Sequence, residues 1–270
     1  MSTIGHTLPP LVDLNCYLGE WPFRRYPCTT ADRLLARMDT LRIERAAVSR
    51  LENVFLKDCL VGNRELAALI APHTDRFTPF YTVNPAFPGW EDDLRLCQEE
   101  LGLAPGAGGI QLHPNYHAYD LAGREAAALL QRAQDAGLPV RVAAALEDPR
   151  TQHWLVQVPP VGNATLTSAI IAFPALRWII AGLNTGSILS LWRDLAAHQP
   201  PEVVFDLSLA QGPLDECALL VENVGAERLV FGTNLPLTIA ESPLLALQHA
   251  DLPDAVKAQI CRDNARRLLA

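Results

Sequence analysis

Short apolar runs rich in β-branched residues alternate with longer amphipathic segments along the whole chain, and this alternation constrains the fold more than any other feature. Eight of these runs are predicted to be strands, at residues 11–17, 46–50, 77–83, 109–112, 140–144, 178–181, 203–207 and 229–231. Eight β/α units in 270 residues are typical of an α/β (β/α)8 TIM barrel, with an open doubly wound sheet as the alternative. Because we find no linker, repeat or low-complexity segment, we expect a single domain over residues 1–270.

The composition excludes several classes of partner. With 22 Lys and Arg against 30 Asp and Glu, the net charge is −8, which argues against a nucleic-acid partner because phosphates are bound by clustered cations. The apolar runs are far shorter than the roughly 20 residues of a membrane span, and residues 1–10 lack the features of a secretory signal. We therefore expect a cytoplasmic protein without a membrane partner. The six cysteines show no CxxC spacing and are interpreted as buried apolar side chains.

Polar residues gather where the predicted strands end, which is where a TIM barrel carries its chemistry. Those expected to line the barrel mouth are Asp13, Asn15, Tyr17, Gln111, His113, Arg141, Asn184, Asp206 and Asn234. Side chains alternate between the two faces of a strand, so Asp13 is predicted to share the inward face with Asn15 and Tyr17.

Three of these residues suggest specific chemistry. His113 is the candidate general acid/base, because a neutral imidazole exchanges protons near pH 7, and its alternative is a structural hydrogen bond to a loop carbonyl. Asp206 is either a carboxylate base or a buried partner of Arg141. Arg141 is either a clamp for a substrate carboxylate, which would make the substrate anionic, or a structural ion-pair partner of Asp13 or Asp206.

Two loops at the same end of the barrel are unusually rich in charged and aromatic residues. Residues 147–154 include Arg150, His153 and Trp154, and they are predicted to form a substrate-binding lid in which Arg150 and His153 contact the ligand. The alternative is a solvated loop with an ion pair between Asp148 and Arg150. Residues 20–25 carry aromatic side chains near Trp21 that either cover the pocket or form a subunit contact, which leaves a homodimer open.

The chain resembles the amidohydrolase-related group of the amidohydrolase superfamily. The matching segments are Asp13 to Tyr17, Arg76-Phe77 with Val83-Asn84-Pro85, Gly109-Ile110 to Pro114, Leu138-Pro139-Val140, Phe231-Gly232-Thr233-Asn234-x-Pro236, and Asn264-Ala265-Arg266-Arg267-Leu268-Leu269. The resemblance implies a TIM barrel related to metal-dependent hydrolases, decarboxylases and lactonases of small acids.

The positions that hold metal ligands in that group differ in this chain. They read Asn15, Tyr17, an alanine at about Ala143, Leu183 or Asn184, and Asn234. A transition metal needs at least three imidazole, thiolate or carboxylate donors, so we predict neither a catalytic metal nor another cofactor.

The resulting hypothesis is metal-independent hydrolysis of a small carboxylate or lactone. His113 would exchange protons, Arg141 would hold a carboxylate, and Asn15, Tyr17 and Asn234 would donate hydrogen bonds to the developing oxyanion. One alternative is an inactive pseudoenzyme that serves as a ligand-binding or interaction scaffold. A further alternative is a decarboxylase of a small acid.

Overall fold

The computed structural model describes residues 8–198, 202–210, 212 and 215–270. Residues 1–7, on which part of the expectation about a secretory signal rests, lie outside this range. Eight parallel strands follow in chain order, each paired with the next. They are β1 (Leu11–Leu18), β2 (Ile43–Arg50), β3 (Phe77–Thr82), β4 (Gly109–Leu112), β5 (Val140–Ala143), β6 (Trp178–Ala181), β7 (Val203–Asp206) and β8 (Leu229–Val230).

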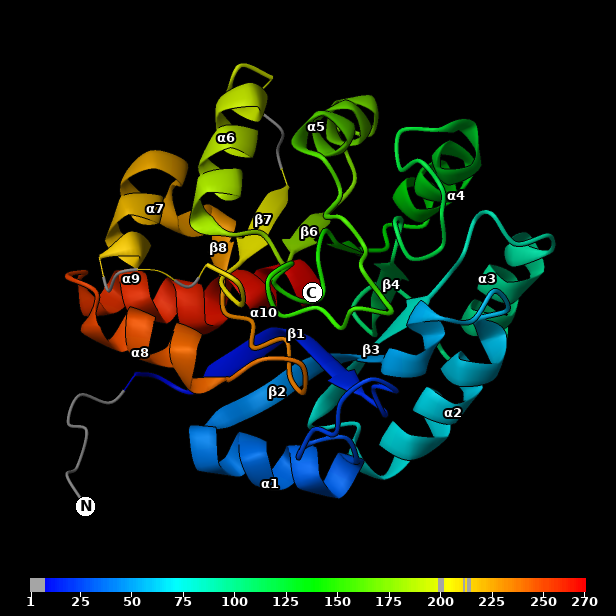
Figure 1. The fold of residues 1–270 in the computed structure, drawn as a ribbon, viewed down its shortest axis with the longest axis horizontal. Helices are drawn as coiled ribbons and strands as arrows, with labels where there is room; N and C mark the ends of the chain where they lie inside the picture. The colour runs from blue at the N-terminus through cyan, green and yellow to red at the C-terminus, as the bar shows by residue number, and fades with distance from the viewer. Residues whose placement is uncertain (1–7, 199–201, 211, 213–214) are drawn as a thin grey trace.

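The last strand meets the first and nearly closes the sheet. The amide of Leu14 donates to the carbonyl of Phe231 at 3.0 Å, and the amide of Tyr17 donates to the carbonyl of Leu235 at 2.7 Å. With helices between the strands (Figure 1), the chain is a single-domain (β/α)8 TIM barrel, as the alternation of segments predicts.

Helices surround the barrel and cover one of its ends. The helices are α1 (Ala31–Leu41), α2 (Leu60–Ile70), α3 (Trp90–Glu99), α4 (Arg124–Asp135), α5 (Asn163–Ala172), α6 (Thr185–Ala196), α7 (Glu216–Val224), α8 (Glu241–His249), α9 (Asp254–Ala258) and α10 (Asn264–Leu269). Short helical turns are η1 (Leu51–Val54), η2 (Ala71–His73), η3 (Ala226–Arg228) and the π-helical η4 (Gln259–Asp263). Across the described residues, no helix is long and apolar enough to span a membrane.

The apolar residues form an inner and an outer layer on the strands. The inner layer fills the barrel with Val12, Leu14, Ala47, Phe80, Ile179, Val204 and Val230, and α10 adds Ala265 and Leu268 from below. The outer layer packs the other strand faces against the helices. The predicted strands agree with the observed ones to within a few residues. The exception is β2, which starts at Ile43 rather than residue 46, because the exposed Glu44 and Arg45 hide its apolar pattern.

A bulge interrupts the pairing of β1 with β2. Asp13 pairs with Ala46 and Cys16 pairs with Val48, so three steps along β1 face two steps along β2. The bulge lets the adjacent residues Leu14 and Asn15 both face inward. Leu14 packs in the inner layer, and the side chain of Asn15 donates to Asp206 on β7.

Asp13 consequently faces away from the barrel interior. Its carboxylate accepts hydrogen bonds from the Cys16 thiol at 2.8 Å, the Thr233 hydroxyl at 2.5 Å, and the amides of Thr233 and Asn15 at 3.0 and 2.9 Å. The prediction that Asp13 shares the inward face with Asn15 and Tyr17 is wrong, because the bulge breaks the regular alternation.

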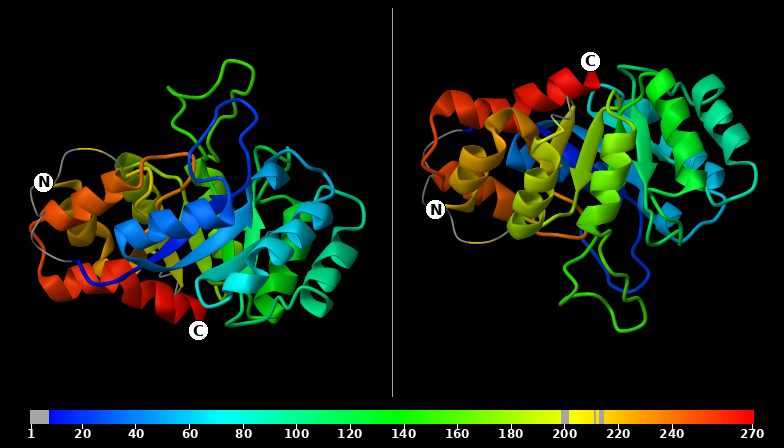
Figure 2. Two further views of the ribbon diagram at one scale, coloured as in Figure 1. Left: turned by 90° about the horizontal axis from the view of Figure 1, so that it is seen from below. Right: turned by 90° about the horizontal axis from the view of Figure 1, so that it is seen from above.

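Two long loops rise side by side from the C-terminal ends of the strands, opposite α10 (Figure 2). They are the β1–α1 loop, residues 19–30, and the β5–α5 loop, residues 144–162. Arg24 Nη2 in the first loop donates to the carbonyl of Thr151 in the second at 3.1 Å. Trp21 is buried against Phe23 and Phe55, with ring centroids 6.0 and 5.1 Å away. Trp21 and Phe23 also pack in one apolar cluster with Tyr17 at the barrel mouth, which favours the covering role expected for residues 20–25.

Candidate active site

Four buried side chains at the barrel mouth carry polar atoms without a hydrogen-bond partner. Each side chain is at most 1% exposed, and the atoms are Asn15 Oδ1, Tyr17 Oη, Asn234 Oδ1 and both ring nitrogens of His113. They come from β1, the end of β4 and the segment after β8. Because buried polar atoms in proteins almost always have partners, this group marks a place suited to a small polar molecule.

Both asparagines of this group are oriented by the groups to which they donate. Asn15 Nδ2 donates to Asp206 Oδ2 at 2.9 Å and to Ser208 Oγ at 3.3 Å, which leaves its carbonyl oxygen unpartnered. Asn234 has a φ of 54°, and its Nδ2 donates to the carbonyl of Leu146 at 2.7 Å. The asparagines thus present acceptors to the mouth, and the amide donors expected of Asn15 and Asn234 toward an oxyanion are engaged within the protein.

His113 and Tyr17 are uncharged at neutral pH. Burial lowers the pKa of His113 well below its usual value, and electrostatic repulsion from Arg141, and from His117 when it is protonated, lowers it further. Burial raises the pKa of Tyr17 to about 12. The two rings lie close, with centroids 6.1 Å apart. A neutral imidazole has one donor and one acceptor nitrogen, so this pair can both take a proton and donate hydrogen bonds.

Asp206 lies behind Asn15 and is held by several donors. Its carboxylate accepts from the amide of Gly182 at 2.8 Å and from Asn15, and burial raises its pKa. The backbone of Gly232 packs closely against this carboxylate, because a Cβ on residue 232 would lie 2.5 Å from Asp206 Oδ2. This geometry favours a positioning role for Asp206, as the group that fixes the orientation of Asn15.

Arg141 lies inside the barrel below the mouth and is fully buried. Its Nη1 donates to the carbonyls of Leu14 and Ala47 at 2.7 and 3.0 Å, and its Nη2 donates to Ser49 Oγ at 2.6 Å. Its Nε donates to Oε1 of Gln111. The guanidinium therefore bridges β1 and β2 at the bulge, where their register shifts.

This set of bonds corrects one expectation and bears on two others. Arg141 forms no ion pair with Asp13 or Asp206, so the expected structural pairing is wrong and backbone carbonyls take its place. Four of its N–H groups are engaged within the protein, which disfavours a clamp for a substrate carboxylate. Gln111 is likewise occupied, since its Nε2 donates to the carbonyl of Leu112 at 2.9 Å.

The other predicted binding residues lie away from His113. Asn184 is exposed and caps α6, where its side chain accepts from the amide of Ser187 at 2.9 Å. Arg150 is exposed and pairs with Asp148 at 2.5 Å, as its alternative interpretation states. His153 stacks on Phe23 in the two long loops, with ring centroids 5.3 Å apart.

Two residues at the mouth were not among the predicted site residues. The hydroxyl of Tyr116 is buried without a partner, and its ring packs against Trp21. Glu147 is 4% exposed and accepts from the hydroxyl of Tyr26 at 3.3 Å, and burial raises its pKa. Tyr116 lies four residues after the strand predicted at 109–112 and Glu147 lies three residues after the one predicted at 140–144, so their position in the chain was the available signal.

The donor set at the mouth does not fit a catalytic transition metal. In the part of the chain that the structure describes, no group of three or more His, Cys, Asp or Glu side chains could hold a metal ion. The unpartnered group offers one imidazole, a phenol and two amides, Tyr116 and Glu147 at the mouth add a second phenol and one carboxylate, and the carboxylate of Asp206 is bonded within the protein. Zinc and manganese sites require more imidazole, thiolate or carboxylate ligands than these residues provide.

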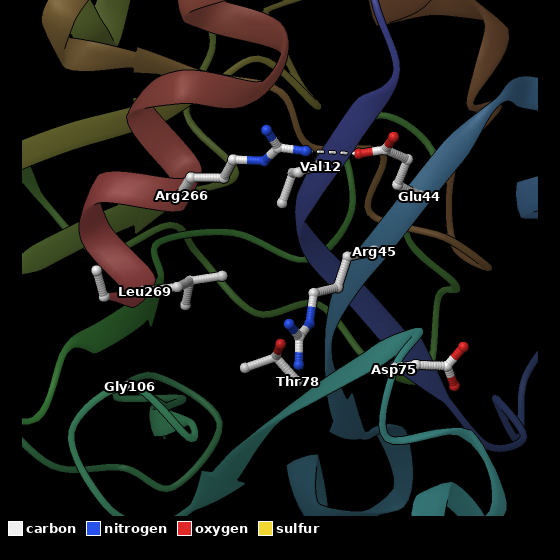
Figure 3. A pocket seen from close by; sticks show the side chains of 9 residues that line it. Val12, Glu44, Arg45, Asp75, Thr78, Gly106, Arg266 and Leu269 are labelled. Carbon is white, nitrogen blue, oxygen red and sulfur yellow. Dashed lines mark hydrogen bonds and ion pairs between the residues drawn. The ribbon is translucent and has the colours of Figure 1, made fainter.

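A cleft of about 990 Å³ opens beside this site, between the β1–α1, β5–α5 and β8–α8 loops. A smaller hollow of about 320 Å³ lies at the opposite end of the barrel. Figure 3 shows the ion pair between Arg266 and Glu44, at 2.8 Å, among the side chains that line it. Only the larger of these two adjoins the C-terminal strand ends, where chemistry is expected.

Solved structures with the same fold include several decarboxylases. The 2,6-dihydroxybenzoate decarboxylase from Rhizobium gives a TM-score of 0.73 at 16% identity, covering 97% of this chain and 99% of that one. A dihydroxybenzoic acid decarboxylase from Polaromonas sp. JS666, with bound manganese and 2-nitroresorcinol, gives 0.70 at 17%, covering 97% of each chain. The 5-carboxyvanillate decarboxylase from Sphingomonas paucimobilis gives 0.68 at 14%, covering 96% and 98%. No curated protein matches the chain.

The chain thus has the TIM-barrel fold that these decarboxylases share. The amidohydrolase family model matches residues 17–270, and the chain belongs to this family. The resemblance inferred from the sequence is confirmed, and membership of this family supports an enzyme.

Proposed function

We propose that this protein hydrolyses an uncharged ester bond, such as that of a lactone, without a catalytic metal. The observation that carries the proposal is the group of buried, unpartnered polar atoms on Asn15, Tyr17, His113 and Asn234. Together they offer acceptors, donors and a neutral base within one water-poor site.

The charge of the lining favours a neutral reacting group. Asn15, Tyr17, Asn234 and the neutral His113 carry no charge, and Arg141 is engaged elsewhere. A carboxylate buried among them would lose its hydration without gaining a cation, which costs several kcal/mol. An ester carbonyl carries no such cost.

The proposed reaction uses His113 first as a base and then as an acid. One amide oxygen, of Asn15 or Asn234, accepts a hydrogen bond from one O–H of a water molecule, and His113 accepts the other O–H and takes its proton as the water oxygen adds to the ester carbon. Tyr17 donates a hydrogen bond to the carbonyl oxygen as it becomes negative. The bond between carbon and the leaving oxygen then breaks, and His113 returns the proton to that oxygen. The product is a hydroxy acid whose carboxyl group loses its proton to solvent on release, and the resulting carboxylate does not match the uncharged lining.

Decarboxylation is the second candidate, because several solved structures with this fold are decarboxylases, one of them complexed with 2,6-dihydroxybenzoate. This reaction would release carbon dioxide from a carboxylate and would need a proton donor to the ring carbon. The two candidates differ in a measurable product, acid from a lactone or carbon dioxide from an aromatic acid.

The test is turnover of a panel of γ- and δ-lactones and 2,6-dihydroxybenzoate, followed by acid release and carbon dioxide release. We expect lactone hydrolysis that falls about 100-fold or more in His113→Gln and is unchanged after chelator treatment. Exposed His198 provides the matched control, His198→Gln, which should keep full activity. Carbon dioxide release alone would support the second candidate. An inert wild-type protein would support the scaffold alternative, and stoichiometric zinc or manganese in active protein would refute metal independence.

A further inference from the structure

The cleft beside the barrel mouth, called here the β8 cleft, has a lining suited to an apolar ligand. Its apolar side chains include Leu209, Leu235, Pro236, Leu237, Ile239 and Leu245. Ile239 is 71% exposed, the highest value among the large aliphatic side chains that the structure describes, and it belongs to this continuous apolar lining rather than standing alone. The volume of about 990 Å³ lies near the upper end of the roughly 300–1,000 Å³ typical of small-molecule sites.

The charged residues of the β8 cleft balance one another. Three arginines face three carboxylates, and the six residues are Arg24, Arg37, Arg150, Glu147, Asp148 and Glu241. Arg37 pairs with Glu241, and Arg150 pairs with Asp148. The remaining two, Arg24 and Glu147, carry opposite charges. Arg24 donates to a loop carbonyl, and Glu147 accepts from a tyrosine hydroxyl. A ligand without net charge therefore matches this cleft best.

The β8 cleft adjoins the candidate active site. Leu237 lines the cleft and also packs in the same apolar cluster as Tyr17. Leu235 lines the cleft as well, and its carbonyl accepts from the amide of Tyr17 at 2.7 Å. Asn234, which directly precedes Leu235, presents its unpartnered oxygen at the mouth.

From this lining, its charge balance and its position next to the candidate active site, we propose that the β8 cleft binds an uncharged alkyl or aryl substituent of the substrate. The substrate is then an ester or lactone that carries an apolar group, rather than a compact acid. This inference rests on the proposed hydrolysis in treating the ligand as a substrate. The binding of an apolar group to the cleft can be measured without turnover.

Binding is tested with Nile red, a neutral apolar fluorophore, and its displacement by 1-alkanols from butanol to octanol. We expect affinity to rise with chain length, by up to about fourfold for each methylene buried. Octanoate should bind more weakly than octanol, because its charge has no complement in the cleft. Ile239→Asp should weaken octanol binding about tenfold. The matched control is Ile171→Asp on α5, where Ile171 is 38% exposed outside the cleft, and it should bind octanol normally.

The outcomes separate this proposal from the proposed reaction. His113→Gln should bind octanol as the wild type does, so loss of hydrolysis with intact binding concerns only the reaction. Affinity that does not depend on chain length, or an equal effect of Ile239→Asp and Ile171→Asp, would overturn the assignment of the cleft. It would also be overturned if octanol fails to bind while Ile239→Asp dissociates a dimer in sedimentation, because a second copy of the chain would then cover the cleft.

Discussion

Replacing Arg141 by methionine tests whether the buried guanidinium stabilises the barrel. The change removes the charge and all five N–H groups but keeps a long side chain inside the barrel. Four hydrogen bonds are lost, two of them to the carbonyls of Leu14 and Ala47 at the bulge between β1 and β2. Cation–π contacts of the guanidinium with Phe80 and Tyr17, at 4.9 and 5.4 Å, are lost as well.

The size of the effect follows from two opposing contributions. A hydrogen bond to a charged group contributes about 1.5–3 kcal/mol, so four bonds contribute about 6–12 kcal/mol. Removing a buried guanidinium also relieves a desolvation cost of several kcal/mol. We therefore expect Arg141→Met to lower the free energy of unfolding by about 3–5 kcal/mol. The pKa of Asp206 should rise in this variant, because the charge of Arg141 lowers it in the wild type.

The assay is urea unfolding at pH 7, followed by tryptophan fluorescence and far-UV circular dichroism. Arg132→Met is the matched control, because Arg132 forms an ion pair with Glu91 at 2.8 Å in which both side chains are more than half exposed. Such a pair contributes at most about 1 kcal/mol. Arg141→Lys keeps the charge without the planar fork and should fall between the two. If Arg141→Met costs no more than the control, the bridging role of the guanidinium is refuted.

Two further predictions concern residues that the structure places outside the group around His113. Burial raises the pKa of Asp13 from 3.8 to about 6, so its contribution to stability is fully present below about pH 4 and is lost as the pH rises through 6. The full loss of stability amounts to about 3 kcal/mol. Urea unfolding between pH 4.5 and 7 should show most of this decline in the wild type and none of it in Asp13→Asn. An unchanged pH slope in the variant would contradict the raised pKa of Asp13. Asn184→Ala removes the cap of α6 and should cost about 1 kcal/mol in the same assay at unchanged hydrolysis rate. A large loss of rate with normal stability would instead give Asn184 the substrate role predicted from the sequence.

The strand order and the inward position of several residues could be predicted from the sequence. Apolar runs and turn residues identify all eight strands, and alternation places Gln111, Arg141 and Asp206 on the inner face. His113 follows β4 by one residue and is buried at the mouth, as predicted. These features depend on local pattern and on the general geometry of a parallel barrel, which is why they need no knowledge of distant contacts.

The features that could not be predicted depend on contacts between distant segments. A bulge in β1 leaves no clear trace in the residue types, yet it turns Asp13 away from the mouth. Two of the four partners of Arg141 are backbone carbonyls of other strands, and no residue type reveals these. The orientation of the Asn15 amide is set by Asp206, 191 residues away. Asn184 is different, because an Asn before a helical segment is a recognisable capping signal that could have been weighed.

The position of Arg141 also has a consequence for the order in which the barrel assembles. Its partners Leu14, Ala47 and Ser49 precede it by 127, 94 and 92 residues. During synthesis, β1 to β4 leave the ribosome before the side chain that bridges the bulge exists. The N-terminal half-barrel therefore lacks this donor until β5 arrives, which couples the two halves of the fold into one cooperative unit.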